Sequence, residues 1–154
     1  MLRIGISQRV YLCPRTNEIR DCLDHRWYDF FNLMDMIPIP IPNNDNVDSL
    51  LLSLKFDGFI LSGGNNLNMK NKIESEKTIL KDLDVSVVRD SIEKKIIDFC
   101  LDKDLPLIGV CRGMQMINSF FGGTIIKVDK DKHVNTYHEV IFKKSIFSDI
   151  YGDS

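Results

Sequence analysis

Apolar and polar positions alternate along the chain in blocks that predict strands and helices in turn. Short apolar runs, bounded by polar or glycine-rich residues, predict strands at residues 2–6, 56–61, 107–110, 124–128 and 139–142. Apolar residues at helical spacing predict helices over residues 17–34 and 92–100, with shorter ones over residues 48–54 and 114–121. This alternation implies an α/β fold, with a mostly parallel sheet covered by helices on both faces.

Two segments interrupt the regular alternation. Residues 36–42 contain three prolines, each of which disfavours the α conformation for its predecessor, so we expect a short strand that ends at the prolines. Residues 65–84 are rich in Lys, Asn and Glu, and we interpret them as a loop with at most one solvated turn of helix.

Two helix ends carry recognisable signals. Asp90 and Glu93 have the spacing of a capping box, which predicts that a helix starts with Asp90 as its N-cap. Gly122 and Gly123 follow the helix expected over residues 114–121, and glycine readily adopts the positive φ that a C-terminal cap requires.

Composition narrows the class of protein. The 154 residues are 44% hydrophobic and 27% charged with a net charge of −2, which indicates a single globular domain over residues 1–154 and no nucleic-acid partner. No apolar run reaches the roughly 20 residues of a membrane helix. Four cysteines without paired spacing predict a cytoplasmic protein with free thiols. No ligand spacing for a metal and no phosphate-binding loop is present, so no cofactor is expected.

Glycine-rich junctions follow two of the predicted strands. Residues 62–64 are Ser-Gly-Gly, and residues 109–113 are Gly-Val-Cys-Arg-Gly. Because ligands of open parallel sheets bind beyond the carboxyl ends of the strands, these junctions mark the expected site.

The second junction has the pattern of a nucleophile elbow with cysteine as its central residue. A sharp turn between strand and helix would hold Cys111 clear of the sheet, and Gly109 and Gly113 would avoid clashes of side chains. The helix N-terminus would favour the thiolate, and the N–H of Arg112 would point toward a developing oxyanion. The alternative for Cys111 is a small buried hydrophobic residue.

The sequence around this junction resembles a known family. Residues 106–118, Pro-Leu-Ile-Gly-Val-Cys-Arg-Gly-Met-Gln-Met-Ile-Asn, are similar to the nucleophile region of class I glutamine amidotransferases. Within that family they resemble the branch of γ-glutamyl hydrolases that includes the γ-glutamyl-γ-aminobutyrate hydrolases. Residues 27–31, residues 57–64 and the pattern Arg89-Asp90-x-x-Glu93 agree with the same branch, so the resemblance covers nearly the whole chain.

The resemblance implies a flavodoxin-like open sheet and hydrolysis of a small-molecule γ-glutamyl amide through a cysteine thioester. Cys111 would be the nucleophile, and the backbone amides of Gly64 and Arg112 would form the oxyanion hole. Gly63 would allow the turn, and Gln115 would hold the glutamyl part of the substrate. For Gln115 an ordinary solvated glutamine is the alternative, and for Gly63 and Gly64 an ordinary turn.

Arg89 is expected to form a structural salt bridge rather than a substrate contact. The catalytic base is harder to place. The family supplies it late in the domain from a His-Pro-Glu type motif, which residues 1–154 do not contain. Of the three histidines, His25 is expected on the first helix facing solvent, and His133 is not favoured as the base. His138 precedes Glu139, but neighbouring strand residues point to opposite faces and cannot easily act as base and orienter.

The chain therefore resembles an incomplete domain that lacks the C-terminal part. It would be a fragment, a chain completed by another chain, or a naturally shortened protein. The first hypothesis is a γ-glutamyl hydrolase whose base lies beyond residue 154. The alternative is a non-catalytic relative that binds a ligand or acts as a scaffold. In either case an uncovered apolar C-terminal region predicts self-association.

Overall fold

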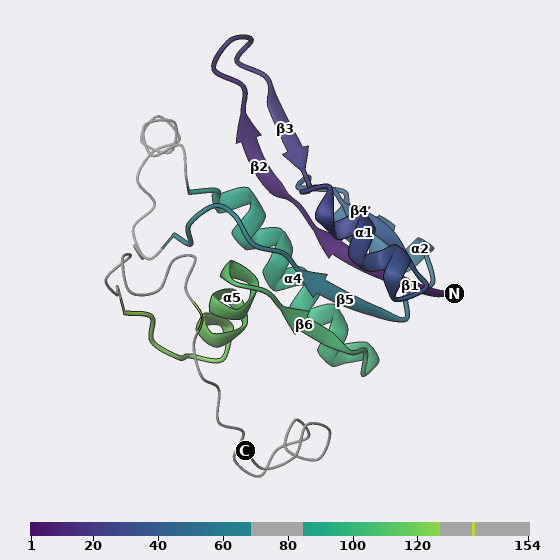
Figure 1. Ribbon diagram of the computed structural model, residues 1–154. Helices are drawn as coiled ribbons and strands as arrows, with labels where there is room; N and C mark the ends of the chain where they lie inside the picture. Colours follow the sequence, from purple (N-terminus) through teal and green to yellow (C-terminus); the bar gives the residue numbers. More distant parts are fainter. Residues whose placement is uncertain (69–84, 127–136, 138–154) are drawn as a thin grey trace.

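The computed structural model describes residues 1–68, 85–126 and 137. The elements in chain order are β1 (Leu2–Ser7), β2 (Arg9–Leu12), β3 (Ile19–Cys22), α1 (Arg26–Leu33), β4 (Met36–Ile41), α2 (Val47–Ser53), β5 (Gly58–Leu61), α4 (Val87–Lys103), β6 (Leu107–Gly109) and α5 (Arg112–Phe120) (Figure 1). None of the helices described is long and apolar enough to cross a membrane.

Four parallel strands form the main sheet in the order β4-β1-β5-β6, which agrees with a flavodoxin-like α/β fold. The chain first adds β4 on one side of β1 and later adds β5 on the other side. In such sheets the ligand crevice lies where the order reverses, at the carboxyl ends of the strands. Ser7 at the end of β1 and Ser62 after β5 therefore stand at the expected crevice.

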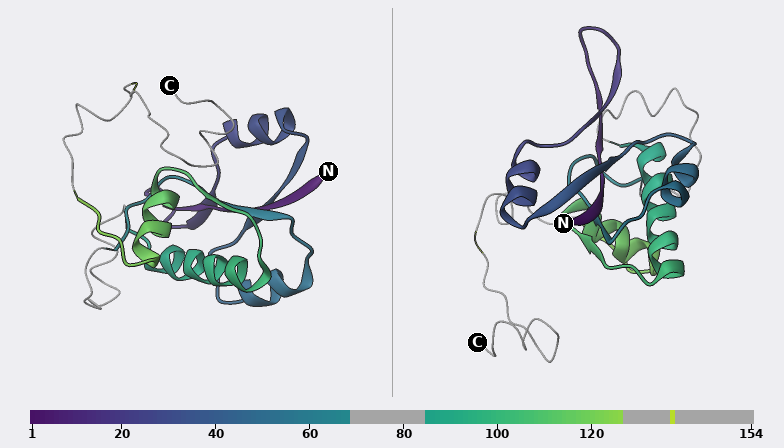
Figure 2. Two further views of the ribbon diagram at one scale, coloured as in Figure 1. Left: turned by 90° about the horizontal axis from the view of Figure 1, so that it is seen from below. Right: turned by 90° about the vertical axis from the view of Figure 1, so that its right-hand side faces the viewer.

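Helices cover both faces of the sheet, as the sequence predicts (Figure 2). On one face α1 places Phe31 against Ile4, Ile6 and Ile60. On the other face α2, α4 and α5 enclose a larger core that includes Phe59 and Leu61. Ile60 lies between Phe59 and Leu61 in the chain but faces the opposite core, because side chains alternate along a strand.

Most elements predicted from periodicity are confirmed. The strands expected at residues 2–6, 56–61 and 107–110 correspond to β1, β5 and β6. The helices expected over residues 48–54, 92–100 and 114–121 correspond to α2, α4 and α5, although α4 is longer. Gly122 has φ of +81° directly after α5, as a helix C-terminal cap requires.

The helix predicted over residues 17–34 is wrong in its first half. β2 and β3 pair antiparallel as a hairpin that extends away from the main sheet (Figure 1), and α1 begins only at Arg26. Asn17 in the hairpin turn has φ of 55°, a conformation that ends regular structure and that asparagine tolerates. His25 is exposed and occupies the N-cap position of α1.

The capping box predicted at Asp90 is also wrong. Ser86 is the N-cap of α4, and its side chain accepts a hydrogen bond from the N–H of Arg89 at 3.2 Å. Asp90 lies one turn inside the helix. The strand β4 continues through Pro38 and Pro40, where we expected it to end. Among the described residues β4 is an edge strand, a position at which the missing N–H groups of proline are tolerated.

Two further predictions fall partly or wholly on residues that the structure does not describe. Residues 124–126, which we expected to begin a strand, have no strand conformation. The remainder of that strand, the strand at residues 139–142 and most of the loop at residues 65–84 lie outside the described residues, as do His133 and His138.

Candidate active site

Cys111 stands at a sharp turn between β6 and α5. Its backbone angles are φ 53° and ψ −106°, which a residue with a side chain adopts only when its surroundings enforce them. The residue is exposed, so the alternative of a buried hydrophobic cysteine is wrong. The N–H of Arg112 is the first amide of α5, and amides of a first helical turn have no partner inside the helix.

Two glycines permit this turn because the neighbouring backbones leave no room for side chains. A Cβ atom added to Gly109 would lie 2.6 Å from the backbone nitrogen of Met114. A Cβ added to Gly113 would lie 2.6 Å from Cβ of Leu61 and closer still to the Leu61 carbonyl oxygen. The N–H of Val110 also donates to that oxygen at 2.9 Å, so the turn sits directly on the end of β5.

The second junction lies beside the first. We use the name glycine loop for residues 62–65, which follow β5. A Cβ built on Gly63 would be 3.6 Å from Cβ of Cys111, so Gly63 faces the cysteine. Gly64 has φ of +83°, and its N–H has no hydrogen-bond partner among the described residues. The two junctions that the sequence singled out are thus brought together, with unpaired amides near an exposed thiol.

The other cysteines differ from Cys111 in their surroundings. Cys100 belongs to α4 and is buried in the core, and burial raises the pKa of its thiol to about 12. Cys13 and Cys22 are partly exposed on the hairpin. A hydrogen bond from the Thr16 side chain lowers the pKa of Cys13. Experiments on Cys111 must therefore separate it from Cys13 and Cys22, whereas Cys100 is protected.

A fully buried arginine holds the glycine loop in place. The guanidinium of Arg89 donates to the carbonyl oxygens of Ser62 at 2.7 Å, Gly63 at 3.0 Å and Gly64 at 2.7 Å. A further donation, at 3.2 Å, reaches the side-chain oxygen of Asn65. Arg89 thus contacts every residue of the loop. The structural salt bridge expected for Arg89 is confirmed by its ion pair with Glu93.

Arg89 belongs to a buried cluster of two cations and two carboxylates. Its Nε donates to Glu93 at 2.8 Å, and the side chain of Arg112 forms ion pairs with Glu93 and with Asp90. Burial lowers the pKa of Arg89, opposed by the charge of Glu93, and burial raises the pKa of Asp90. The hydroxyl of Ser7 donates to Glu93 at 2.8 Å, which connects the cluster to the end of β1.

Sequence analysis assigned the elbow but not this cluster. The spacing of Arg89 and Glu93 is that of an ion pair one helical turn apart, so that pair could have been inferred from the sequence. The pairing with Arg112 could not, because it depends on the packing of α5 against α4. The Nε of Arg112 is buried and has no hydrogen-bond partner among the described residues.

Gln115 lies one helical turn after Cys111. Its N–H donates to the carbonyl oxygen of Cys111 at 3.2 Å, and its side chain is half-buried and forms no hydrogen bond within the described residues. The predicted role of Gln115 in holding the glutamyl part of a substrate stays a prediction. Among the described residues no group of three His, Cys, Asp or Glu side chains could hold a metal ion.

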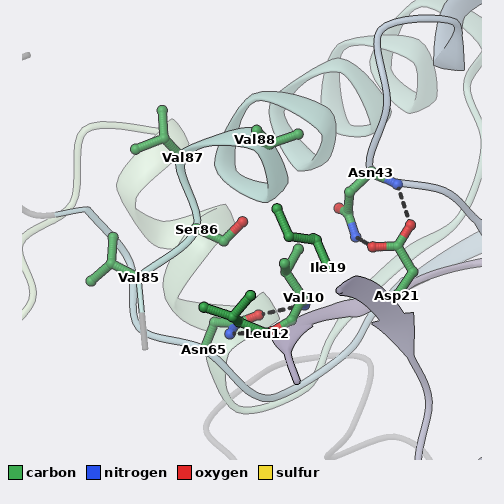
Figure 3. A pocket seen from close by; sticks show the side chains of 10 residues that line it. All are labelled: Val10, Leu12, Ile19, Asp21, Asn43, Asn65, Val85, Ser86, Val87 and Val88. Carbon is green, nitrogen blue, oxygen red and sulfur yellow. Dashed lines mark hydrogen bonds between the residues drawn. The ribbon is translucent and has the colours of Figure 1, made fainter. Parts of the chain in front are cut away.

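A cavity of about 290 Å³ lies near the glycine loop, between the hairpin and the start of α4 (Figure 3). Its lining is mostly apolar and consists of Val10, Leu12, Ile19, Asp21, Asn43, Asn65, Val85, Ser86, Val87 and Val88. The side chain of Asn65 is already engaged, because it bonds both backbone groups of Val10. The cavity thus shares a wall with the loop that faces Cys111.

Known proteins are similar to this chain over most of its length. A family model described as Peptidase C26 matches residues 4–148. The gamma-glutamyl-CDP-amidate hydrolase of Campylobacter jejuni is 34% identical over 147 residues, which are 94% of this chain and 66% of that protein.

Two further relatives match less of their own length. A glutamine amidotransferase-like protein of Rickettsia prowazekii is 33% identical over 109 residues, which are 70% of this chain and 37% of that protein. A glutamine-hydrolyzing GMP synthase subunit of Methanococcus maripaludis is 21% identical over 126 residues, which are 82% of this chain and 54% of that protein. The chain therefore spans 66% or less of the length of each of these three relatives.

Proposed function

The chain belongs to the peptidase C26 family of class I glutamine amidotransferases, and we propose that it acts in the hydrolysis of γ-glutamyl amides through a thioester on Cys111. The observation that carries the proposal is the position of Cys111. It is an exposed cysteine in a positive-φ turn, next to a glycine loop in which the N–H of Gly64 has no partner among residues 1–68, 85–126 and 137. The similarity to the gamma-glutamyl-CDP-amidate hydrolase of C. jejuni supports the proposal that the bond hydrolysed is a γ-glutamyl amide.

In the proposed reaction the Cys111 thiolate attacks the γ-carbonyl carbon, and a carbon–sulfur bond forms while the carbonyl oxygen becomes an oxyanion. The N–H groups of Gly64 and Arg112 donate to that oxygen, with Gly63 making the turn that lets the loop approach. Collapse of the intermediate breaks the carbon–nitrogen bond, and the amine leaves with a proton from a general acid. Water then hydrolyses the thioester, which releases glutamate and restores the thiol.

The remaining roles follow the same proposal. In this proposal the half-buried side chain of Gln115, one helical turn from the nucleophile, holds the glutamyl moiety. The general base and its orienting group would come from residues beyond 154, as the family resemblance implies. The amine half of the substrate stays open between a γ-glutamyl amine and a γ-glutamyl adduct of a sugar or capsule precursor.

The test is hydrolysis of three γ-glutamyl amides: glutamine, a γ-glutamyl anilide and γ-glutamyl-CDP-amidate. We expect turnover when residues beyond 154 are present and none with residues 1–154 alone. Cys111→Ser should abolish turnover, whereas Cys22→Ser on the hairpin should leave it unchanged. Turnover that survives Cys111→Ser would contradict the proposal, and turnover by residues 1–154 alone would refute our placement of the base. Glutamyl binding without turnover in either form would favour the ligand-binding alternative.

A further inference from the structure

We propose that Arg89 is a positioning residue for the oxyanion hole. Arg89 sets the direction of the amides of the glycine loop and, through Glu93, the spacing between these amides and the nucleophile turn. The inference rests on the proposed function, because it assigns a task within the same site.

The first argument is the direction of the contacts. Arg89 binds the carbonyl oxygens of three consecutive residues, Ser62, Gly63 and Gly64, at 2.7 to 3.0 Å. In a trans peptide the N–H of the next residue points opposite to the carbonyl. Three carbonyls drawn toward the guanidinium therefore leave the following N–H groups pointing away from it. One of these groups is the N–H of Gly64, to which no described residue is hydrogen-bonded.

The second argument is that this orientation would not persist without Arg89. Gly63 and Gly64 have no side chains to restrict their φ and ψ, and glycine has more conformational freedom than any other residue. Gly64 has a positive φ, and glycine adopts negative φ values about as readily, so its own backbone does not hold it in this conformation. An arginine has five N–H donors in a fixed planar fork, whereas a lysine ammonium has three on a flexible stem. Three donors are too few to serve the three loop carbonyls and Glu93 together.

The third argument is the connection to the nucleophile turn. Glu93 is fully buried and receives Nε of Arg89 on one oxygen and the guanidinium of Arg112 on the other. Arg112 follows Cys111 directly and carries the second proposed oxyanion donor. A single carboxylate thus joins the two segments that supply the two donors, at the crevice between β1 and β5.

The experiment separates two reactions of the same sulfur. Acylation of Cys111 by a γ-glutamyl thioester forms an oxyanion, and its leaving thiolate needs no general acid. Alkylation by iodoacetamide displaces iodide and forms no oxyanion. Both rates are measured by mass spectrometry of the Cys111 peptide, in a background where Cys13 and Cys22 are replaced by serine. The ratio of the two rates separates stabilisation of the oxyanion from the reactivity of the thiolate itself.

In Arg89→Met we expect the acylation rate to fall by about 10- to 100-fold, while alkylation changes by less than about twofold. Arg89→Lys keeps the charge beside Glu93 but loses the fork, and its acylation should fall by roughly fivefold or more. Lys95→Met is the matched control, since it removes an exposed cation from the same helix, and both its rates should equal those of the unsubstituted chain.

Each outcome of this experiment supports or overturns the positioning role of Arg89 or the proposed function. Unchanged acylation in folded Arg89 variants, or parallel loss of acylation and alkylation, overturns the positioning role. If Arg89→Met does not fold, Arg89→Lys decides by the same ratio. Failure of both variants to fold also overturns it, because Arg89 would then support the fold as a whole. Absence of acylation in the unsubstituted chain is a different result, which contradicts the proposed function itself.

Discussion

Gly113→Ala tests whether the nucleophile turn is pressed against the sheet as closely as the structure shows. Gly113 is the second residue of α5, and an added Cβ would lie 2.6 Å from Cβ of Leu61 and closer still to its carbonyl oxygen. Carbon atoms in contact are normally about 3.5–4.0 Å apart. Alanine therefore requires α5 to move away from β5 by about 1 Å.

Two effects of opposite sign compete in this substitution. Alanine is a better helix former than glycine by about 1 kcal/mol, which alone would stabilise the protein. Overpacking of a tight contact destabilises by about 1–3 kcal/mol. Because the nearest atom belongs to the backbone of Leu61, no change of rotamer relieves the overlap, and we take the upper end of that range. The net expectation is a loss of about 2 kcal/mol.

Urea unfolding followed by circular dichroism measures the difference directly. Gly63→Ala is the matched control, because its added Cβ meets Cys111 at an ordinary 3.6 Å and its φ is not positive. We expect its free energy of unfolding to change by less than about 0.5 kcal/mol. If Gly113→Ala is as stable as the unsubstituted chain or more stable, the close approach of α5 to β5 is refuted.

Three further outcomes are expected. Ser86→Ala removes the side-chain cap of α4 and should lower the free energy of unfolding by about 1 kcal/mol in urea; no change would contradict the cap. Cys100 should resist alkylation in the native protein and react on unfolding. The pKa of the Cys100 thiol in the folded protein, about 12, is above the value of 9.0 for a free thiol. The contribution of Cys100 to stability is therefore complete below pH 9.0 and is lost as the pH rises toward about 12. An unfolding midpoint in urea that stays constant across that pH range would contradict this expectation. Ile108 is exposed on β6, and no described strand pairs with the outer edge of β6. Ile108→Lys should therefore reduce self-association measured by light scattering, and a monomeric unsubstituted chain would refute that prediction.

Local signals in the sequence were sufficient for the sheet and the nucleophile turn. Apolar runs specify β1, β5 and β6 because strands buried on both faces are apolar throughout. Gly109 and Gly113 flank Cys111 with the spacing of a nucleophile elbow. The structure shows why both are glycines, because an added Cβ at either position would overlap neighbouring backbone atoms. The juxtaposition of the two glycine-rich junctions also follows from the sequence, because carboxyl ends of parallel strands meet at one edge.

The wrong predictions have a common physical cause, which is contact between segments that are apart in the sequence. Ile19 and Cys22 fit a helical spacing, but pairing with β2 makes them part of a hairpin. Asp90 and Glu93 fit a capping box, but both carboxylates pair with Arg112, which lies about twenty residues away and is brought near by α5. Short-range patterns contain no information about such partners, so the ion pairs of Arg112 with Asp90 and Glu93 were found only in the structure.

The most direct test of the central claim is the reaction of the native chain with a glutamine-derived chloroketone, measured by mass spectrometry of individual peptides. We expect one adduct on the peptide that contains Cys111, no adduct on that of Cys100, and loss of the adduct in Cys111→Ala. Competition by a γ-glutamyl compound should slow labelling of Cys111 and leave that of Cys13 and Cys22 unaffected. Equal total labelling of the Cys111→Ala variant would contradict the account.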